Sequence, residues 1–187
     1  MRIKIFLLLL AFLCVEIAET NAQQLVCPNG YMLMNVSSSK CKLWATTTTA
    51  VSVFDGDKSE FKVVVYPETF ISQDDSMAHI FLKEFIQADS FQEIRLTTNI
   101  LDFDKLDRKK EFTSPIKMKG KLFFQGITKD VEFEGNIHYR PRLSIIDYVL
   151  YVPIADFGLV PPKEFKKCLS PIMEIKGNAS LYFIEPE

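Results

Sequence analysis

The sequence lacks the residue patterns that most enzymes and metalloproteins require. It has only two histidines, His79 and His138, and their spacing does not suit a shared metal ion. It also contains no HExxH motif, no glycine-rich phosphate loop and no dinucleotide-binding fingerprint. We therefore predict no catalytic residues and no metal site, and we expect a protein that is not an enzyme.

The chain also lacks an excess of charge of either sign. It carries 22 Lys and Arg residues against 24 Asp and Glu residues, which gives a formal net charge of −2 at pH 7. The basic residues between positions 102 and 112 are mixed with acidic ones, as in a solvated turn or short helix. A nearly neutral chain does not attract polyanions, so we expect no nucleic-acid partner.

No hydrophobic run is long enough to span a bilayer, which takes roughly twenty apolar residues. The apolar run over residues 5–15 follows Arg2 and Lys4, and small residues come soon after it. A basic start, a short apolar stretch and a small-residue cleavage site are typical of a signal peptide. We predict that residues 1–22 are removed by cleavage near Ala22. The mature chain would then have no transmembrane segment and would be periplasmic or secreted.

A lipid anchor at Cys14 is the alternative fate for this N-terminus. Lipid attachment usually needs a small residue before the cysteine, whereas Leu13 is bulky and Glu16 follows closely. An attached acyl chain would hold the protein at a membrane. We favour cleavage and release.

Cysteine is scarce in the predicted mature chain, which keeps Cys27, Cys41 and Cys168. Because an exported protein meets an oxidising compartment, we expect one disulfide. Three cysteines allow three single pairings, and each pairing leaves one thiol over. We favour Cys27 with Cys41, which would attach the N-terminal segment to the first strand.

The body of the chain shows short alternating segments of apolar and polar residues. Within residues 116–124 Lys117, Lys119 and Lys121 alternate with apolar residues, and within residues 131–139 the outer positions hold Glu132, Glu134, Asn136 and His138. A period of two predicts half-buried strands, and these two should pair antiparallel. A polar lead-in over residues 23–37 precedes this region. The predicted strands cover residues 41–53, 60–66, 94–101, 116–124, 131–139, 144–154 and 172–184, with a helix over residues 80–90.

Seven or eight short strands with at most one or two short helices predict an all-β barrel or sandwich. Of the sixteen phenylalanines of the chain, Phe6 and Phe12 leave with the predicted signal peptide, and the others suit the interior of either fold. An interior this rich in aromatic residues can be a packed core or can line a cavity for an apolar ligand. Composition does not choose between these two.

Three segments resemble, in order, parts of the YceI-like family. Residues 118–131 (MKGKLFFQGITKDV) resemble its signature hairpin, and residues 85–96 and 154–159 resemble segments before and after it. The resemblance covers residues 38–183. It implies an eight-stranded antiparallel, lipocalin-like barrel over residues 38–187, in a periplasmic protein. It also implies an apolar tunnel that holds an isoprenoid chain, such as a polyprenyl or quinone tail.

An isoprenoid ligand would leave no sharp motif in the sequence. It has few polar atoms, and burying apolar area contributes about 25 cal/mol per Å² without particular residues. We therefore predict a hydrophobic small-molecule ligand, and no other cofactor. The alternative is a structural or interaction protein with a barrel filled by side chains. The candidate cavity residues are Phe61, Val63, Phe81, Phe85, Leu96, Met118, Leu122, Phe133, Ile137, Leu150, Ile175 and Leu181.

Overall fold

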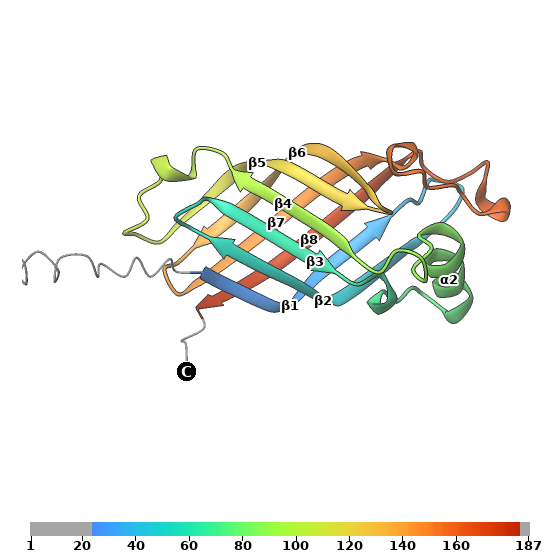
Figure 1. Ribbon diagram of the computed structural model, residues 1–187, viewed down its shortest axis with the longest axis horizontal. Helices are drawn as coiled ribbons and strands as arrows, with labels where there is room; N and C mark the ends of the chain where they lie inside the picture. The colour runs from blue at the N-terminus through green and yellow to red at the C-terminus, as the bar shows by residue number, and fades with distance from the viewer. Residues whose placement is uncertain (1–23, 184–187) are drawn as a thin grey trace, which may run out of the picture.

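Eight antiparallel strands form a closed barrel in which each strand pairs with its neighbours in the sequence, and β8 pairs with β1 (Figure 1). The computed structural model describes residues 24–183, so the predicted signal peptide lies outside the described residues. This arrangement confirms the predicted fold class. The strands are β1 (Gln24–Asn35), β2 (Trp44–Asp55), β3 (Glu60–Val65), β4 (Ile94–Ile100), β5 (Phe112–Phe124), β6 (Ile127–Tyr139), β7 (Leu143–Pro153) and β8 (Ile172–Phe183).

The first strand corrects the predicted lead-in. Residues 24–35 are not a polar lead-in but form β1, which closes the barrel between β2 and β8. The register shifts against both neighbours around Gly30, next to Pro28 and Asn29. Such an irregularity interrupts the period of two. The strand is therefore hard to see in the sequence.

The hairpin of β5 and β6 is the longest ladder in the barrel. Its turn consists of Gln125 and Gly126, whose φ angles of 49° and 73° suit a two-residue turn between twisted strands. β6 therefore begins at the residue after this turn, four residues before the predicted start. Lysines face glutamates across this hairpin as predicted: Lys117 Nζ lies 3.8 Å from Glu134 Oε1, and Lys119 Nζ lies 3.9 Å from Glu132 Oε2.

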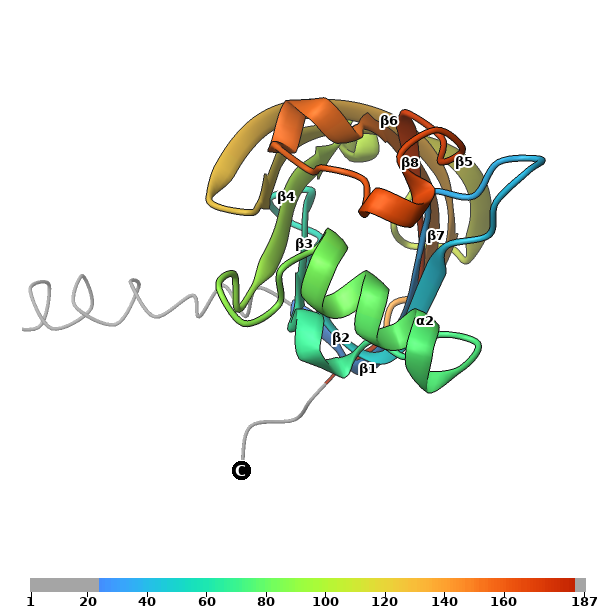
Figure 2. The same ribbon diagram turned by 90° about the vertical axis from the view of Figure 1, so that its right-hand side faces the viewer.

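One end of the barrel is covered by a short helical segment between β3 and β4. It comprises α2 (Asp75–His79) and the π-helical η2 (Ile80–Phe85), so the helix begins five residues before the predicted start. The Oδ1 atom of Asp74 caps α2 by accepting a hydrogen bond of 2.8 Å from the Met77 amide. Figure 2 shows the segment lying across the barrel mouth. None of the described helices is long and apolar enough to cross a membrane.

Four short 3₁₀ segments lie in the connections at the two ends. They are η1 (Pro67–Thr69), η3 (Phe103–Lys105), η4 (Ile154–Phe157) and η5 (Lys163–Phe165).

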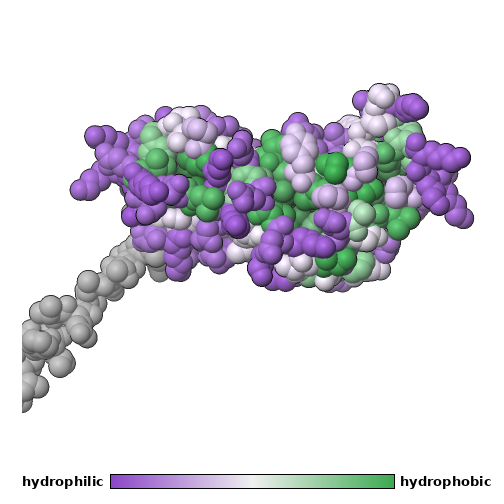
Figure 3. Space-filling model, turned by 90° about the horizontal axis from the view of Figure 1, so that it is seen from above, coloured by the Kyte–Doolittle hydropathy of each residue, from purple (hydrophilic) through white to green (hydrophobic). Residues whose placement is uncertain are grey.

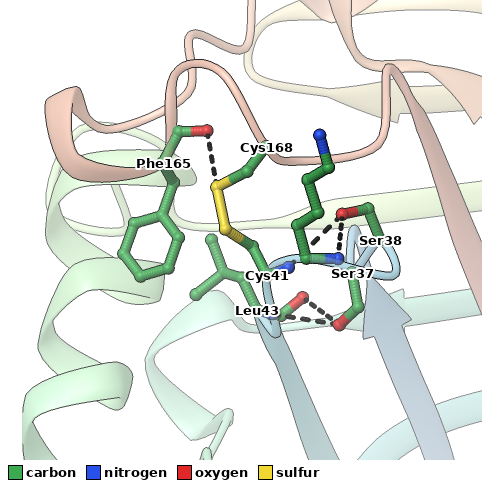
Figure 4. Close-up of a disulfide and its surroundings, with 7 residues drawn as sticks. Ser37, Ser38, Cys41, Leu43, Phe165 and Cys168 are labelled. Carbon is green, nitrogen blue, oxygen red and sulfur yellow. Dashed lines mark hydrogen bonds between the residues drawn. A yellow bond between two sulfur atoms is a disulfide. The ribbon is translucent and has the colours of Figure 1, made fainter.

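The disulfide joins two loops at the end that α2 covers (Figure 4). It links Cys41, between β1 and β2, to Cys168, between β7 and β8, with 5.6 Å between the Cα atoms. The predicted pairing of Cys27 with Cys41 is therefore wrong. Cys27 is a free thiol whose side chain is buried in the core within β1. The loop of Cys41 is shaped locally, because the Cys41 amide donates a 3.3 Å hydrogen bond to Ser38 Oγ.

Candidate ligand-binding site

All of the predicted cavity residues lie in the core, on strands β3 to β8 and on η2, and none is more than 7% exposed. The inward direction of these side chains is thereby confirmed. A role in ligand binding stays a prediction. They are Phe61, Val63, Phe81, Phe85, Leu96, Met118, Leu122, Phe133, Ile137, Leu150, Ile175 and Leu181.

A small enclosed cavity lies among these side chains inside the barrel. Its volume is about 10 Å³, whereas even a single water needs roughly 10–15 Å³ and ligand pockets usually measure roughly 300–1,000 Å³. This part of the barrel is thus filled by side chains. The lining residues are Met32, Val63, Ile94, Leu96, Leu122, Leu150 and Ile175.

Aromatic side chains fill the barrel end beneath α2 and η2. Phe81 lies 6.2 Å from Phe70 and 5.8 Å from Phe85, measured between ring centroids. At the same end, Phe124 lies 5.7 Å from Phe157 of η4. All five rings are almost completely buried, so two groups of packed aromatic side chains occupy this end of the barrel.

A second group of aromatic residues closes the opposite end. The ring of Phe103, in η3, packs edge-on against Phe54 at 5.1 Å and against Tyr139 at 5.8 Å. Tyr139 in turn stacks on Phe112 at 5.0 Å. The loop between β4 and β5 therefore closes this end with the side chain of Phe103. Both barrel ends are closed in this structure.

The outer wall carries a large groove near the middle of the barrel. It crosses β5, β6, β7, β8 and β1 and has a volume of about 880 Å³. Figure 3 shows the side on which β5 and β6 lie uppermost, with apolar surface in the middle and hydrophilic side chains toward both ends. The lining residues are Tyr31, Pro115, Ile116, Lys117, Glu132, Phe133, Glu134, Gly135, Asn136, Asp147, Tyr148, Val149, Tyr151, Lys176, Gly177 and Asn178.

The groove lies where the barrel wall is least continuous. The register between β6 and β7 begins at His138 with Ile145 and ends at Glu134 with Val149. Beyond that point β6 continues paired with β5 alone, and β7 continues paired with β8 alone. The two strands thus part next to the groove. Inward-facing residues of both strands, such as Phe133, line the groove as well as the core.

Tyr148 is the most deeply buried polar side chain at the groove. Its ring covers Gly177 on the neighbouring strand so closely that a Cβ atom there would lie 2.1 Å from Tyr148 Cζ. The ring centroid also lies 5.8 Å from those of Phe61 and Phe133. The side chain is only 3% exposed, and burial raises the pKa of Tyr148 well above its usual value. Among residues 24–183 no buried side-chain nitrogen or oxygen lacks a hydrogen-bond partner, so the Tyr148 hydroxyl is not a buried, unpaired donor.

The rim of the groove carries charges of both signs. Asn178 Nδ2 donates a 2.6 Å hydrogen bond to Asp147 Oδ1, and Tyr151 donates one of 3.1 Å to Glu174 Oε1. Lys176 Nζ lies 3.0 Å from the same Glu174 oxygen. Burial raises the pKa of Glu174, but hydrogen bonds from Lys176, Asn35 and Tyr151 outweigh it and lower the pKa overall. Such a rim gives no strong field of either sign.

The two histidines take no part in the groove. His138 is exposed on the outer face of β6, where its Nδ1 lies 2.9 Å from Thr113 Oγ1. His79 is exposed at the end of α2. Across the described stretch of the chain, no three His, Cys, Asp or Glu side chains gather as a metal site.

Comparison with known proteins gives structural matches only, because neither a family model nor a curated protein matches the sequence. A polyisoprenoid binding domain from Saccharophagus degradans, implicated in plant cell wall breakdown, matches with a TM-score of 0.72. The match covers 88% of this chain and 100% of that one, at 8% identity. The chain has the YceI-like fold.

Two further solved structures are similar to the YceI-like barrel described here. Burkholderia cenocepacia BcnA matches with a TM-score of 0.61 at 15% identity, over 81% of this chain and 95% of that one. The YceI protein of Campylobacter jejuni matches with a TM-score of 0.48 at 16% identity, over 74% and 81% of the two chains. Likenesses at these identities show the fold alone.

The sequence-based reasoning found the interior but missed the groove. Of the predicted cavity residues, only Phe133 also lines the groove. The sequence feature that could have indicated the groove is a row of short polar residues on the outer face of the barrel. The row crosses β6, β7 and β8 and consists of Asn136, Asp147 and Asn178. Because strands far apart in sequence contribute to this row, the alternation within each strand does not reveal it.

Proposed function

We propose that this YceI-like barrel is a non-enzymatic lipid-binding protein for an isoprenoid-type ligand, such as a polyprenyl chain or a quinone tail. The observation that carries the proposal is the likeness to a polyisoprenoid binding domain over that domain's full length. The interior chemistry supports it, because the buried side chains are overwhelmingly apolar. An apolar chain can be stabilised there by burial alone.

The interior would have to adapt to such a ligand, because its cavity holds about 10 Å³ in this structure. Four buried methionines, Met32, Met34, Met118 and Met173, supply the means. Methionine side chains are unbranched and can repack around irregular shapes. A filled interior in the free protein is therefore compatible with uptake of a flexible chain.

An exported location forms part of the proposal. The disulfide between Cys41 and Cys168 supports an oxidising compartment such as the periplasm or the extracellular space. The predicted signal peptide over residues 1–22 supports the same location. In that compartment, the protein would carry a poorly soluble isoprenoid through the aqueous phase.

A structural or interaction protein without a ligand is the second candidate. The small interior cavity and the aromatic side chains packed at both ends favour it, because a barrel closed in this way is already a complete core. This candidate predicts no uptake of lipid.

Native mass spectrometry after gentle purification distinguishes the two candidates. If the proposal holds, the protein carries a co-purified lipid or takes up an added prenyl quinone in a one-to-one complex. The same quinone headgroup without its tail should not bind, because the tail supplies the apolar area. A protein that is uniformly empty and takes up no prenyl quinone would contradict the proposal and favour the ligand-free candidate.

A further inference from the structure

The two barrel ends are poor routes for a ligand. One mouth is filled by buried aromatic rings and covered by α2 and η2, and the loops beside it are joined by the disulfide of Cys41 and Cys168. The other mouth is filled by the rings of Phe54, Phe103 and Tyr139. A ligand that entered through either end would have to displace several packed aromatic side chains at once.

The side wall offers a shorter route at the fork between β6 and β7. There the ladder ends at Glu134 and Val149, so no backbone hydrogen bonds between the two strands need to break beyond this pair. Phe133 and Tyr148 line the outer groove and also face the core. The enclosed cavity begins one inward position further along β7, at Leu150. One layer of side chains thus separates the groove from the interior.

The groove also has the size and chemistry for a chain with a polar head. Its volume of about 880 Å³ falls in the roughly 300–1,000 Å³ range of ligand sites. Phe133, Val149 and the ring of Tyr148 supply apolar surface. Tyr148 lines the groove although its side chain is only 3% exposed.

We propose that the groove on the outer wall is the site where a prenyl quinone binds, with Phe133 and Tyr148 forming the gate through which its tail enters the barrel between β6 and β7. The proposal rests on the proposed function and adds the place and the path of binding. The headgroup lies among the polar side chains of the rim. The tail runs along the apolar floor and passes between β6 and β7 as the gate side chains move aside.

A pair of matched valine variants tests the site. Val149 is a half-buried, outward residue on β7 that lines the groove, and Val51 is an outward residue of β2, 37% exposed, that does not. We expect Val149→Arg to weaken binding of a short-tailed prenyl quinone by about tenfold or more, since a bulky charge then occupies the apolar floor. Val51→Arg should leave the affinity within about twofold. Circular dichroism checks that both variants fold.

Photo-crosslinking gives an independent measurement on the unmodified protein. A farnesol analogue with a diazirine on its chain should label the β6 and β7 peptides that contain Phe133, Tyr148 and Val149. Labelling confined to Phe81 and Phe85, or to Phe103, would show access through an end and would overturn the lateral site. Equal quinone affinity of the two valine variants would overturn it as well.

The outcomes separate the two proposals. If wild-type protein binds the quinone but Val149→Arg does so equally well, the lateral site is wrong and the lipid-binding function stands. If wild-type protein binds no prenyl quinone, the proposed function fails, and the lateral site fails with it.

Discussion

Individual glycines allow the walls of this barrel to approach each other closely. A Cβ atom at Gly120 in β5 would lie 2.0 Å from the carbonyl oxygen of Thr97 and 2.5 Å from the Cα atom of Thr98. These atoms belong to the backbone of β4, which cannot swing aside as a side-chain tip can. In contrast, the nearest atom to a Cβ at Gly56 would be 3.8 Å away. Gly120 is therefore required because a Cβ atom does not fit at its position, whereas a Cβ atom fits at Gly56.

We predict that Gly120→Ala lowers the free energy of unfolding by about 1–3 kcal/mol, because overpacking forces the β4 and β5 backbones apart. Gly56→Ala is the control, and its effect should stay within about 0.5 kcal/mol. Urea denaturation of both variants measures the difference. Equal midpoints for Gly120→Ala and wild type would show that the sheet relaxes without cost.

The turn between β2 and β3 is organised by one buried carboxylate. Asp55 Oδ1 accepts hydrogen bonds of 3.1 Å from the amides of both Asp57 and Lys58, and its Oδ2 lies 3.1 Å from Lys58 Nζ. Burial raises the pKa of Asp55, but these bonds outweigh it, so that the pKa is lowered from 3.8. Arg108 ties the turn to the loop after β4 by donating a 2.8 Å hydrogen bond to the Gly56 carbonyl.

We expect Asp55 to make the fold sensitive to acid. Because its pKa is lower in the folded state, its stabilisation is fully present above the unfolded value of 3.8 and is lost as pH falls through the folded value. At pH 7, Asp55→Asn should lower the free energy of unfolding by about 1–2 kcal/mol. Below pH 4, the variant should lose less further stability than the wild-type protein does. Chemical denaturation at pH 7 and pH 3 checks this. The exposed Asp130→Asn serves as control, and an acid dependence unchanged by Asp55→Asn would refute the assignment.

On the scale of the whole molecule, the disulfide joins segments from opposite ends of the sequence. Cys41 and Cys168 are 127 residues apart, yet their loops meet at one end of the barrel because β8 returns beside β1. A crosslink across so long a loop restricts the unfolded chain strongly. The free thiol of Cys27, buried in β1, takes no part.

We predict that replacing Cys41 and Cys168 by serine together lowers the free energy of unfolding by about 2–4 kcal/mol. In the wild-type protein, peptide mapping should link the peptides of these two cysteines. Cys27 should react with an alkylating reagent only after unfolding, since its side chain is buried. A Cys27 peptide linked to either other cysteine would contradict the structure.

Much of the barrel could be predicted from local patterns. The alternation in β5 and β6 depends only on successive side chains facing opposite sides of a sheet, so it predicts both strands and an outer face of lysines opposite one of glutamates. The register that pairs Lys117 with Glu134 and Lys119 with Glu132 follows from the two-residue turn, which the sequence did not predict. β1 was missed because the irregularity around Gly30 breaks the period of two. The pairing of Cys41 with Cys168 was missed because sequence distance says nothing about which loops meet.

The sequence by itself determined the strands other than β1, their inward faces and the apolar character of the interior, because these follow from the period of side chains along one strand. Tertiary structure decided which strands and loops that are distant in the sequence come into contact. Closure of the barrel brought Cys41 to Cys168 and left Cys27 alone. The parting of β6 and β7 opened a groove beside Tyr148, and side chains from opposite walls filled the interior. These features depend on distances between strands, which no single segment encodes.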